Sequence, residues 1–450
     1  MAPLAELAAT PADLIVIGGG ITGTGIARDA ALRGLRTVLL EQRDLAWGTS
    51  GRSSRLVHGG LRYLEHGDFK LVFEALRERA ILQQIAPHLV RPLSFVFPLH
   101  QGDRLPLWKL AAGMWLYDLL ALFRNVRRHQ MLGKRALLER EPALRTAGLK
   151  GAARYFDAQC DDARLVVATA RSARAAGAAI RTWTGVTGFL REGGRVTGVV
   201  ARDVESGTDA ELRAAVVVNA TGPWVDALRG LEQDGAVTPL LRRTKGAHVV
   251  VPRARIGHTE GITFLSPLDG RVMFVLPWGD WSYIGTTDTD TAESPDAVVV
   301  TPEDVRYLLR SANSRFPSAR LSEDDVIATW AGLRPLIDSS ARAADAVSRE
   351  HAIVDGPGGV LTVAGGKLTT YRAMAAEVVH AARREFARRV EDVLVRRVHL
   401  FYETEDRGRE AAPRTAELLG RELSWTAAEI VRRRDEYIAL THADSTPPPG

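Results

Sequence analysis

The chain of 450 residues contains a single cysteine, Cys160. One thiol excludes a disulfide framework and a cysteine-ligated cluster, and it is typical of a protein from a reducing compartment. No stretch carries the roughly 20 uninterrupted apolar residues that a membrane-spanning helix needs. No early segment combines a basic region, an apolar core and a cleavage site, so we expect no secretory leader.

The sequence also lacks a strong charge of one sign. Its 59 basic and 54 acidic residues leave a net charge of +5, and these charges are scattered along the chain. Nucleic-acid binding is typical of a stripe of basic and aromatic residues, which we do not find, so no nucleic-acid partner is predicted. No metal site is predicted either. With 46% hydrophobic residues, the composition is that of an ordinary globular protein.

The most informative stretch is Asp13–Glu41. It opens with an apolar, β-branched run typical of a buried parallel strand. Glycines at 18, 20 and 23 then follow the G-x-G-x-x-G pattern, in which backbone approaches a pyrophosphate at a helix N-terminus. A second strand over 37–40 delivers Glu41, an acceptor for ribose hydroxyls. Strand, glycines, helix, strand and acid in this order predict a dinucleotide site for NAD or FAD rather than NADP.

Further segments suited to close cofactor contact are spread along the chain. Residues 48–60 are rich in glycine, serine and threonine, the strand over 215–219 ends in Ala220-Thr221-Gly222, and a last strand ends in Gly365-Gly366. A nicotinamide enzyme normally keeps its nucleotide fold contiguous. Separate contact segments favour a long, two-ended cofactor, so we predict FAD.

We predict an α/β fold with a Rossmann-like FAD-binding domain built from discontinuous segments, an α+β substrate domain around an antiparallel sheet, and a small C-terminal helical cap. The sheet is expected over 239–322, where short apolar runs alternate with polar ones. The predicted boundaries are 12–90, 155–235 and 326–385 for the FAD-binding domain, 91–154 for a helical insertion, 236–325 for the antiparallel sheet and 386–450 for the cap.

The most apolar window, Leu105–Phe123, has two interpretations. Lys109 and Asp118 interrupt it, tryptophans lie within it, and basic residues follow it. This composition is typical of a helix lying in a membrane interface. It also fits a buried helix of the substrate domain, and the sequence leaves both interpretations open.

Several motifs resemble the FAD-dependent glycerol-3-phosphate dehydrogenases, which are D-amino-acid-oxidase-like flavoproteins. They occur in order between about residues 12 and 385 and read GTSGRSSRLVHGGLRYLEHGDFKLVFEALRERA, APHLVRPL, DDARLV, NATGPWV, KGAHVVVP, IGTTDTD, AGLRPL and AGGKLTTYR. The resemblance implies oxidation of sn-glycerol 3-phosphate to dihydroxyacetone phosphate with FAD as cofactor. It implies electron transfer to quinone, a cytoplasmic protein peripheral on the inner face of the cell membrane, and is compatible with a homodimer.

The expected cofactor contacts combine the glycine segments with the resemblance. They are Gly18, Gly20, Thr22, Gly23, Glu41, Gln42, Thr49, Ser50, Ser53, Ser54, Arg55, His58, Gly59, Gly60, Val186, Thr221, Gly222, Gly366, Lys367, Leu368 and Thr369.

Alcohol oxidation needs a base, a hydride acceptor and balance for the developing charge. The resemblance implies His248 as the base, with Lys245 helping to hold it, and places Arg62, Tyr63, Arg349 and Lys367 at the substrate phosphate. Lys367 with its helix N-terminus would stabilise reduced flavin, and Arg334 would polarise the substrate oxygen. Asp288 and Asp290 are interpreted as turn residues.

Three alternatives remain at this stage. One is a soluble oxidase that passes electrons to O₂, and another is a dehydrogenase of a related polyol phosphate such as erythritol phosphate. The third is a flavin-binding protein that has lost turnover. Retention of Arg334, Arg349, Lys367 and His248 argues against the last.

Overall fold

The computed structural model describes residues 3–233, 235–337, 351–384, 409–413, 415–417 and 426–442. The chain divides into two compact units, Met1–Ala376 and Glu377–Gly450. The first unit contains two large sheets, and the second contains α14 (Ala427–His442). The residues of the predicted site all fall within the first unit. One of them, Arg349, lies outside the described residues.

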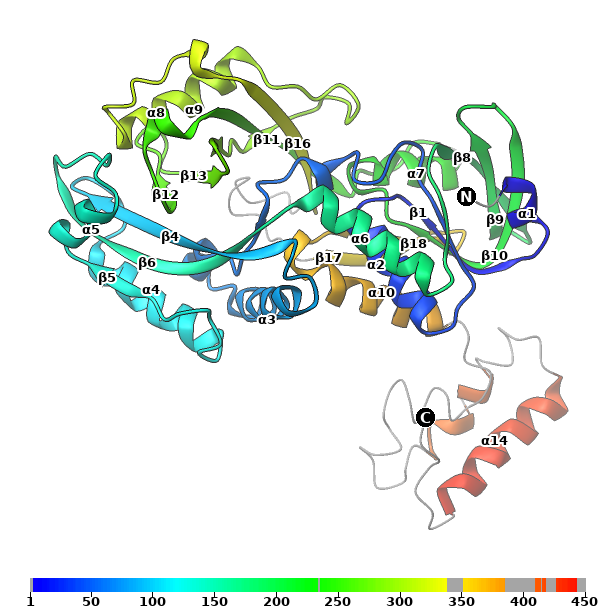
Figure 1. Ribbon diagram of the computed structural model, residues 1–450. Coiled ribbons are helices and arrows are strands. Elements are labelled where there is room, and N and C mark those ends of the chain that lie inside the picture. The colour runs from blue at the N-terminus through cyan, green and yellow to red at the C-terminus, as the bar shows by residue number, and fades with distance from the viewer. Residues whose placement is uncertain are drawn as a thin grey trace. The chain divides into compact units, whose positions relative to one another are not determined.

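The first sheet has the strand order β17-β18-β10-β1-β2-β7, and its central strands are parallel (Figure 1). An antiparallel hairpin of β8 and β9 extends from β10. The strands are β1 (Ala12–Ile17), β2 (Thr37–Leu40), β7 (Ala179–Arg181), β8 (Thr184–Glu192), β9 (Arg195–Asp203), β10 (Asp209–Asn219), β17 (His351–Asp355) and β18 (Leu361–Gly365).

The second sheet is mainly antiparallel and has ten strands. They are β3 (Leu56–Val57), β4 (Val90–His100), β5 (Gln130–Leu132), β6 (Leu149–Cys160), β11 (Leu241–Pro252), β12 (Gly261–Leu265), β13 (Val272–Trp278), β14 (Trp281–Gly285), β15 (Thr289–Asp290) and β16 (Ala328–Ile337). The chain therefore crosses repeatedly between the sheets, which confirms the predicted fold class of a discontinuous nucleotide-binding fold combined with an antiparallel sheet. The individual domain boundaries stay predictions.

Helices cover both sheets. Figure 1 shows α2 and α6 side by side along the first sheet, and α3 and α4 below β4 and β6 of the second. The helices of the first unit are α1 (Leu4–Ala8), α2 (Ile21–Leu32), α3 (Phe69–Ile85), α4 (Leu107–Leu120), α5 (Lys134–Arg140), α6 (Asp162–Ala175), α7 (Val225–Glu232), α8 (Arg253–Ile256) and α9 (Pro302–Arg315). A further helix, α10 (Tyr371–Arg384), begins in the first unit.

Both faces of the second sheet are buried. Alternate side chains of a strand point to opposite faces, so a single strand contributes to two cores. Phe95 and Phe97 of β4 pack in a core with α3 and α4, whereas Val96 packs in a different core with α5 and α9. The sequence did not predict α9, which falls within the expected all-strand segment. Its start is fixed by a capping box, in which Thr301 and Asp304 bond each other's backbone N–H.

Candidate active site

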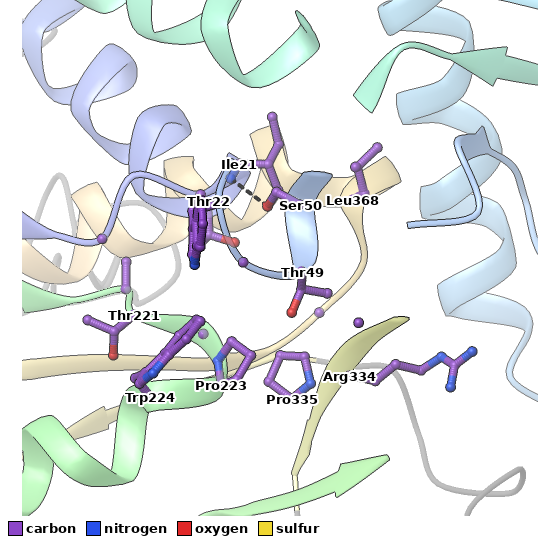
Figure 2. Close-up of a pocket in the computed structure, with 18 of the residues that line it drawn as sticks. Ile21, Thr22, Thr49, Ser50, Thr221, Pro223, Trp224, Arg334, Pro335 and Leu368 are labelled. Atoms are coloured by element: carbon purple, nitrogen blue, oxygen red, sulfur yellow. Dashed lines mark hydrogen bonds between the residues drawn. The ribbon is translucent and has the colours of Figure 1, made fainter. Parts of the chain in front are cut away.

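A cavity of about 520 Å³ lies where the parallel strands of the first sheet end. The ends of β1, β2, β10 and β18 line it, and so does β16 of the second sheet. Figure 2 shows Trp224, Pro223, Pro335 and Arg334 in a row along the lower part of the view, with Thr22, Ser50 and Leu368 above them. Ligands of open α/β sheets bind at the carboxyl ends of the strands, so the fold itself places a ligand here.

The turn between β1 and α2 accepts only glycine at two positions. Gly18 has φ of +113°, and a Cβ there would lie 2.5 Å from the carbonyl oxygen of Ala220. A Cβ on Gly23 would lie 1.9 Å from the oxygen of Gly18. The Ser50 hydroxyl accepts a hydrogen bond of 2.9 Å from the Ile21 N–H at the start of α2 (Figure 2). The helix N-terminus thus faces the cavity with little side-chain bulk, as an anion site requires.

Glu41 occupies the predicted position at the end of β2. Its carboxylate accepts hydrogen bonds of 2.6 Å from the Gly19 N–H and 2.8 Å from the Arg43 N–H. Burial raises the pKa of Glu41, and the hydrogen bonds from Arg43 and Gly19 oppose that rise. Each oxygen keeps a second lone pair, so the group fits the ribose-acceptor role that we predicted.

Arg334 lies at the opposite end of the cavity on β16. Its guanidinium pairs with Asp288 at 2.9 Å and donates to the Thr286 hydroxyl at 2.9 Å and to the Thr287 carbonyl at 3.0 Å. Asp288 is therefore more than the turn residue that we expected, because it orients Arg334. Lys367 and Tyr63 also line this cavity, and the Lys367 ammonium lies 4.8 Å from the centre of the Tyr63 ring.

His248 on β11 is buried against aromatic rings. Its ring stacks on Trp330 with centroids 4.7 Å apart, and its Nε2 lies 2.8 Å from the Ser54 hydroxyl. Burial, with the positive charges of Arg334 and Arg55, lowers the pKa of His248 to about 3. Within the described part of the chain, the buried Nδ1 has no hydrogen-bond partner. The ring is thus neutral and has an unused nitrogen, whereas Lys245, expected to support it, pairs with Asp304 at 2.7 Å.

A pH dependence of stability follows from His248. The unfolded chain takes up a proton at this residue near pH 6.5, but the folded protein does so only near pH 3. The stability gained by keeping the ring neutral is present above about pH 6.5 and is lost as the pH falls towards about 3. Wild type should lose about 1.4 kcal/mol more per pH unit between pH 6 and 4 than His248→Gln. Denaturant titrations of both proteins test this, and parallel curves would contradict it.

A second cavity of about 360 Å³ adjoins the first, with which it shares Ser54, His58, Tyr63 and Arg334 among its walls. Much of the remaining wall is apolar and comes from β4, β13 and α4. Arg62 lines this second cavity only. Substrate-sized space therefore continues from the end of the first cavity where Arg334 and Lys367 lie.

The structure brings most of the predicted site residues together around these cavities. The first cavity is lined by Gly18, Gly20, Thr22, Glu41, Gln42, Thr49, Ser50, Ser53, Ser54, His58, Tyr63, Val186, Thr221, Gly222, His248, Arg334, Gly366, Lys367, Leu368 and Thr369. Gly60 and Arg62 line the second, and Gly23, Arg55 and Gly59 line neither. Their roles stay predictions, as does that of Arg349.

Comparison with known proteins identifies the fold. A family model described as FAD dependent oxidoreductase matches residues 13–372, which is most of the chain. The chain belongs to the FAD dependent oxidoreductase family. A second model, the C-terminal domain of alpha-glycerophosphate oxidase, matches residues 363–430.

Two curated relatives of this FAD dependent oxidoreductase carry related names. Glycerol-3-phosphate dehydrogenase 2 of Mycobacterium tuberculosis is 44% identical over 394 residues, covering 86% of this chain and 66% of the relative. The aerobic glycerol-3-phosphate dehydrogenase of Staphylococcus haemolyticus is 40% identical over 368 residues, covering 82% and 66%. The chain thus spans a little under two thirds of the length of these relatives.

A solved structure is also similar. The glycerol-3-phosphate dehydrogenase from Bacillus halodurans, complexed with FAD, superposes with a TM-score of 0.70 at 29% identity and covers 97% of this chain and 96% of its own. The predicted flavoprotein family and the predicted cofactor FAD are confirmed. The cavity fits FAD in its own right, because glycine-only backbone and Glu41 suit the ADP end and Lys367 suits an anionic ring edge at the other.

Sequence reasoning missed three residues that this FAD dependent oxidoreductase places behind its site. Asp288 holds Arg334, Trp330 stacks on His248, and Asp157 bonds the backbone of the 58–60 loop. Asp288 carried a weak signal, since it lies in a motif quoted for the resemblance. The other two pack or bond through residues distant in sequence, so no local pattern marks them.

Proposed function

We propose that the protein oxidises sn-glycerol 3-phosphate to dihydroxyacetone phosphate and passes the electrons to a quinone. The observation that carries the proposal is that Arg334, Lys367, Tyr63 and His248 all line the first cavity, and that Arg334 and Tyr63 also line the second. A small alcohol with a phosphate dianion requires this combination of cations and an unprotonated nitrogen. The names of the relatives at 40–44% identity support the same substrate.

The reaction moves a hydride and a proton. FAD, when bound, supplies the hydride acceptor at N5. The C2–H bond breaks with its electron pair, the hydroxyl proton leaves, and the C2–O bond becomes a carbonyl. We assign the proton to His248, whose neutral ring carries a lone pair on one nitrogen. Arg334, fixed by Asp288, stabilises negative charge that develops on the substrate oxygen.

The phosphate end is assigned to Arg62, Tyr63 and Arg349, with Lys367 shared between phosphate and flavin. Arg62 supports this role because its guanidinium stacks on the Tyr63 ring at 5.0 Å and lines the second cavity. Guanidinium groups bind phosphate through paired N–H donors, which fixes the orientation of a small substrate. Substrates that share a phosphate end, such as erythritol phosphate, are discriminated by the cavity beyond it.

The test is anaerobic absorbance of the FAD-loaded protein before and after addition of sn-glycerol 3-phosphate. Bleaching of the flavin band near about 450 nm is the expected result, because it requires hydride transfer to the cofactor. An unchanged spectrum that bleaches with erythritol phosphate would replace the substrate. Reoxidation by quinone under argon supports the dehydrogenase. Reoxidation by air alone would favour the oxidase, which the match to a glycerophosphate-oxidase C-terminal domain keeps as the second candidate.

We further propose that the protein works in the cytoplasm, peripherally on the inner face of the cell membrane, through α4. Leu110, Met114 and Tyr117 of this helix are buried, but Trp108 and Trp115 are 73% and 57% exposed. Leu119, Leu122 and Phe123 add exposed apolar surface, and basic residues follow at 124, 127 and 128. Exposed tryptophans beside arginines suit an anionic lipid interface. No helix in the described ranges is long and apolar enough to span a membrane.

Replacing both tryptophans of α4 tests this interface. The double variant Trp108→Ser/Trp115→Ser should bind vesicles containing anionic phospholipid at least about 10-fold more weakly than wild type, because it loses the two exposed aromatic rings that would enter the lipid interface. Co-sedimentation at low salt measures the partition. Trp281→Ser is the matched control, since Trp281 is 43% exposed on β14 rather than on α4. Wild type that stays in the supernatant, or an equal loss in the control, would contradict the proposal.

A further inference from the structure

A buried charged cluster lies directly behind the 58–60 loop. Arg79 of α3, Tyr117 of α4 and Asp157 of β6 are 2%, 0% and 4% exposed. The Arg79 guanidinium forms an ion pair with Asp157 and donates to the Phe156 carbonyl at 3.0 Å. The Tyr117 hydroxyl lies 2.9 Å from both oxygens of Asp157. The proposed function uses none of these three residues.

The cluster bonds the backbone of Gly59. The Gly59 N–H donates to the Tyr117 hydroxyl at 3.0 Å and to Asp157 Oδ1 at 3.2 Å. A Cβ at this position would lie 2.4 Å from the tyrosine oxygen, so only glycine allows this approach. Burying an ion pair costs several kcal/mol per ion unless further hydrogen bonds compensate it, and here part of that compensation comes from the loop.

The other side of the loop faces the cavities. The Gly59 carbonyl accepts from the Lys367 ammonium at 3.5 Å, and a Cβ on Gly60 would lie 3.1 Å from the same nitrogen. Thr369 accepts from the His58 N–H at 3.2 Å. The cluster therefore holds the N–H of a peptide segment whose carbonyl is in contact with Lys367.

We propose that Asp157 and Tyr117 are positioning residues that set where the Lys367 ammonium lies. They act through Gly59: Asp157 also lines the second cavity, but neither residue lines the first cavity, where Lys367 lies. The inference rests on the proposed role of Lys367 beside the flavin N1–C2=O edge. The inference goes beyond that role, because a cluster built from α3, α4 and β6 then determines where the positive charge beside the flavin lies.

Tyr117→Phe is the test variant, because it removes one hydroxyl and leaves the Arg79–Asp157 ion pair in place. In the FAD-loaded protein we expect the dissociation constant of sulfite to rise about 10-fold, since the adduct at flavin N5 leaves negative charge at N1–C2=O. The rate of flavin reduction by glycerol 3-phosphate should fall by a similar factor. Tyr307→Phe is the control, because its hydroxyl lies 3.0 Å from both oxygens of Asp269 but lines neither cavity.

A double-mutant cycle separates positioning from general loosening. In a Lys367→Met background, Tyr117→Phe should change sulfite binding less than twofold, since the ammonium it positions is gone. An independent 10-fold loss in that background, or an equal effect of Tyr307→Phe, would overturn the inference. So would wild-type sulfite affinity in Tyr117→Phe itself. Sulfite binding needs no substrate, so the result stands apart from whether glycerol 3-phosphate is the alcohol oxidised.

Discussion

Gly23→Ala should weaken FAD binding at least about 100-fold. The added Cβ would lie 1.9 Å from the Gly18 carbonyl oxygen, a contact that no rotamer relieves because methyl and carbonyl are both fixed to the backbone. The β1–α2 turn must then open, which moves the N–H groups that face the cavity. An anion site built from backbone N–H donors loses binding free energy when those donors no longer point at the same anion.

Fluorescence titration of the apoprotein with FAD measures this effect. Gly133→Ala is the matched control, because nothing lies within 4 Å of its Cβ and it lines neither cavity. The control should bind FAD as wild type does. If Gly23→Ala retained wild-type affinity with an unchanged melting temperature, the turn would not be the pyrophosphate site.

Arg334→Met should slow flavin reduction by glycerol 3-phosphate about 10²- to 10³-fold, the range for loss of one preorganised donor to an oxyanion. Arg334 is held by Asp288, Thr286 and Thr287, so its charge costs little reorganisation when negative charge develops on the substrate. Methionine keeps much of the side-chain volume and removes every N–H donor. Binding of FAD itself should change little.

Anaerobic stopped-flow absorbance gives the reduction rate at saturating substrate. Arg242→Met is the control, because Arg242 lies on the neighbouring strand β11, pairs with Asp290 of β15 and lines neither cavity. A rate that falls equally in both variants points to damage to the sheet. A variant whose KM rises while its rate is preserved would place Arg334 at the phosphate instead of at the reacting oxygen.

The nucleotide end was predictable because its information is local. Strand, glycine turn, helix and Glu41 lie within one stretch of 29 residues, and the hydrogen bond from the Gly19 N–H to Glu41 joins two members of that stretch. The proposed catalytic end was predicted from motifs, which indicated Arg334 and His248 but not the residues that hold them. His248 is contacted by Ser54 and Trp330, and Arg334 by Asp288. These contacts arise only from the tertiary fold, so no local pattern predicts them.

The cluster of Arg79, Tyr117 and Asp157 behind Gly59 could not be predicted from local sequence patterns. Its members come from α3, α4, β6 and a loop, and each alone is typical of an ordinary helix arginine, core tyrosine or strand aspartate. Only the packing of α3 and α4 on the sheet brings them to one carboxylate. Helix α9 was missed for a different reason, since its capping box occurs within a segment whose apolar runs favoured strands.

The strand pairing of the first sheet also determines how much of the chain must be synthesised before that sheet can form. Ile15 of β1 pairs with Val217 of β10, and Val218 of β10 pairs with Leu361 of β18, so β1 leaves the ribosome long before β10 and β18 exist. Its other neighbour, β2, follows directly after α2. Strands β4 and β6 pair with each other much sooner. Long loops must close before the parallel strands meet, which makes this a slow, high-contact-order assembly. The first sheet can therefore be completed, and the dinucleotide captured, only after β18 has emerged.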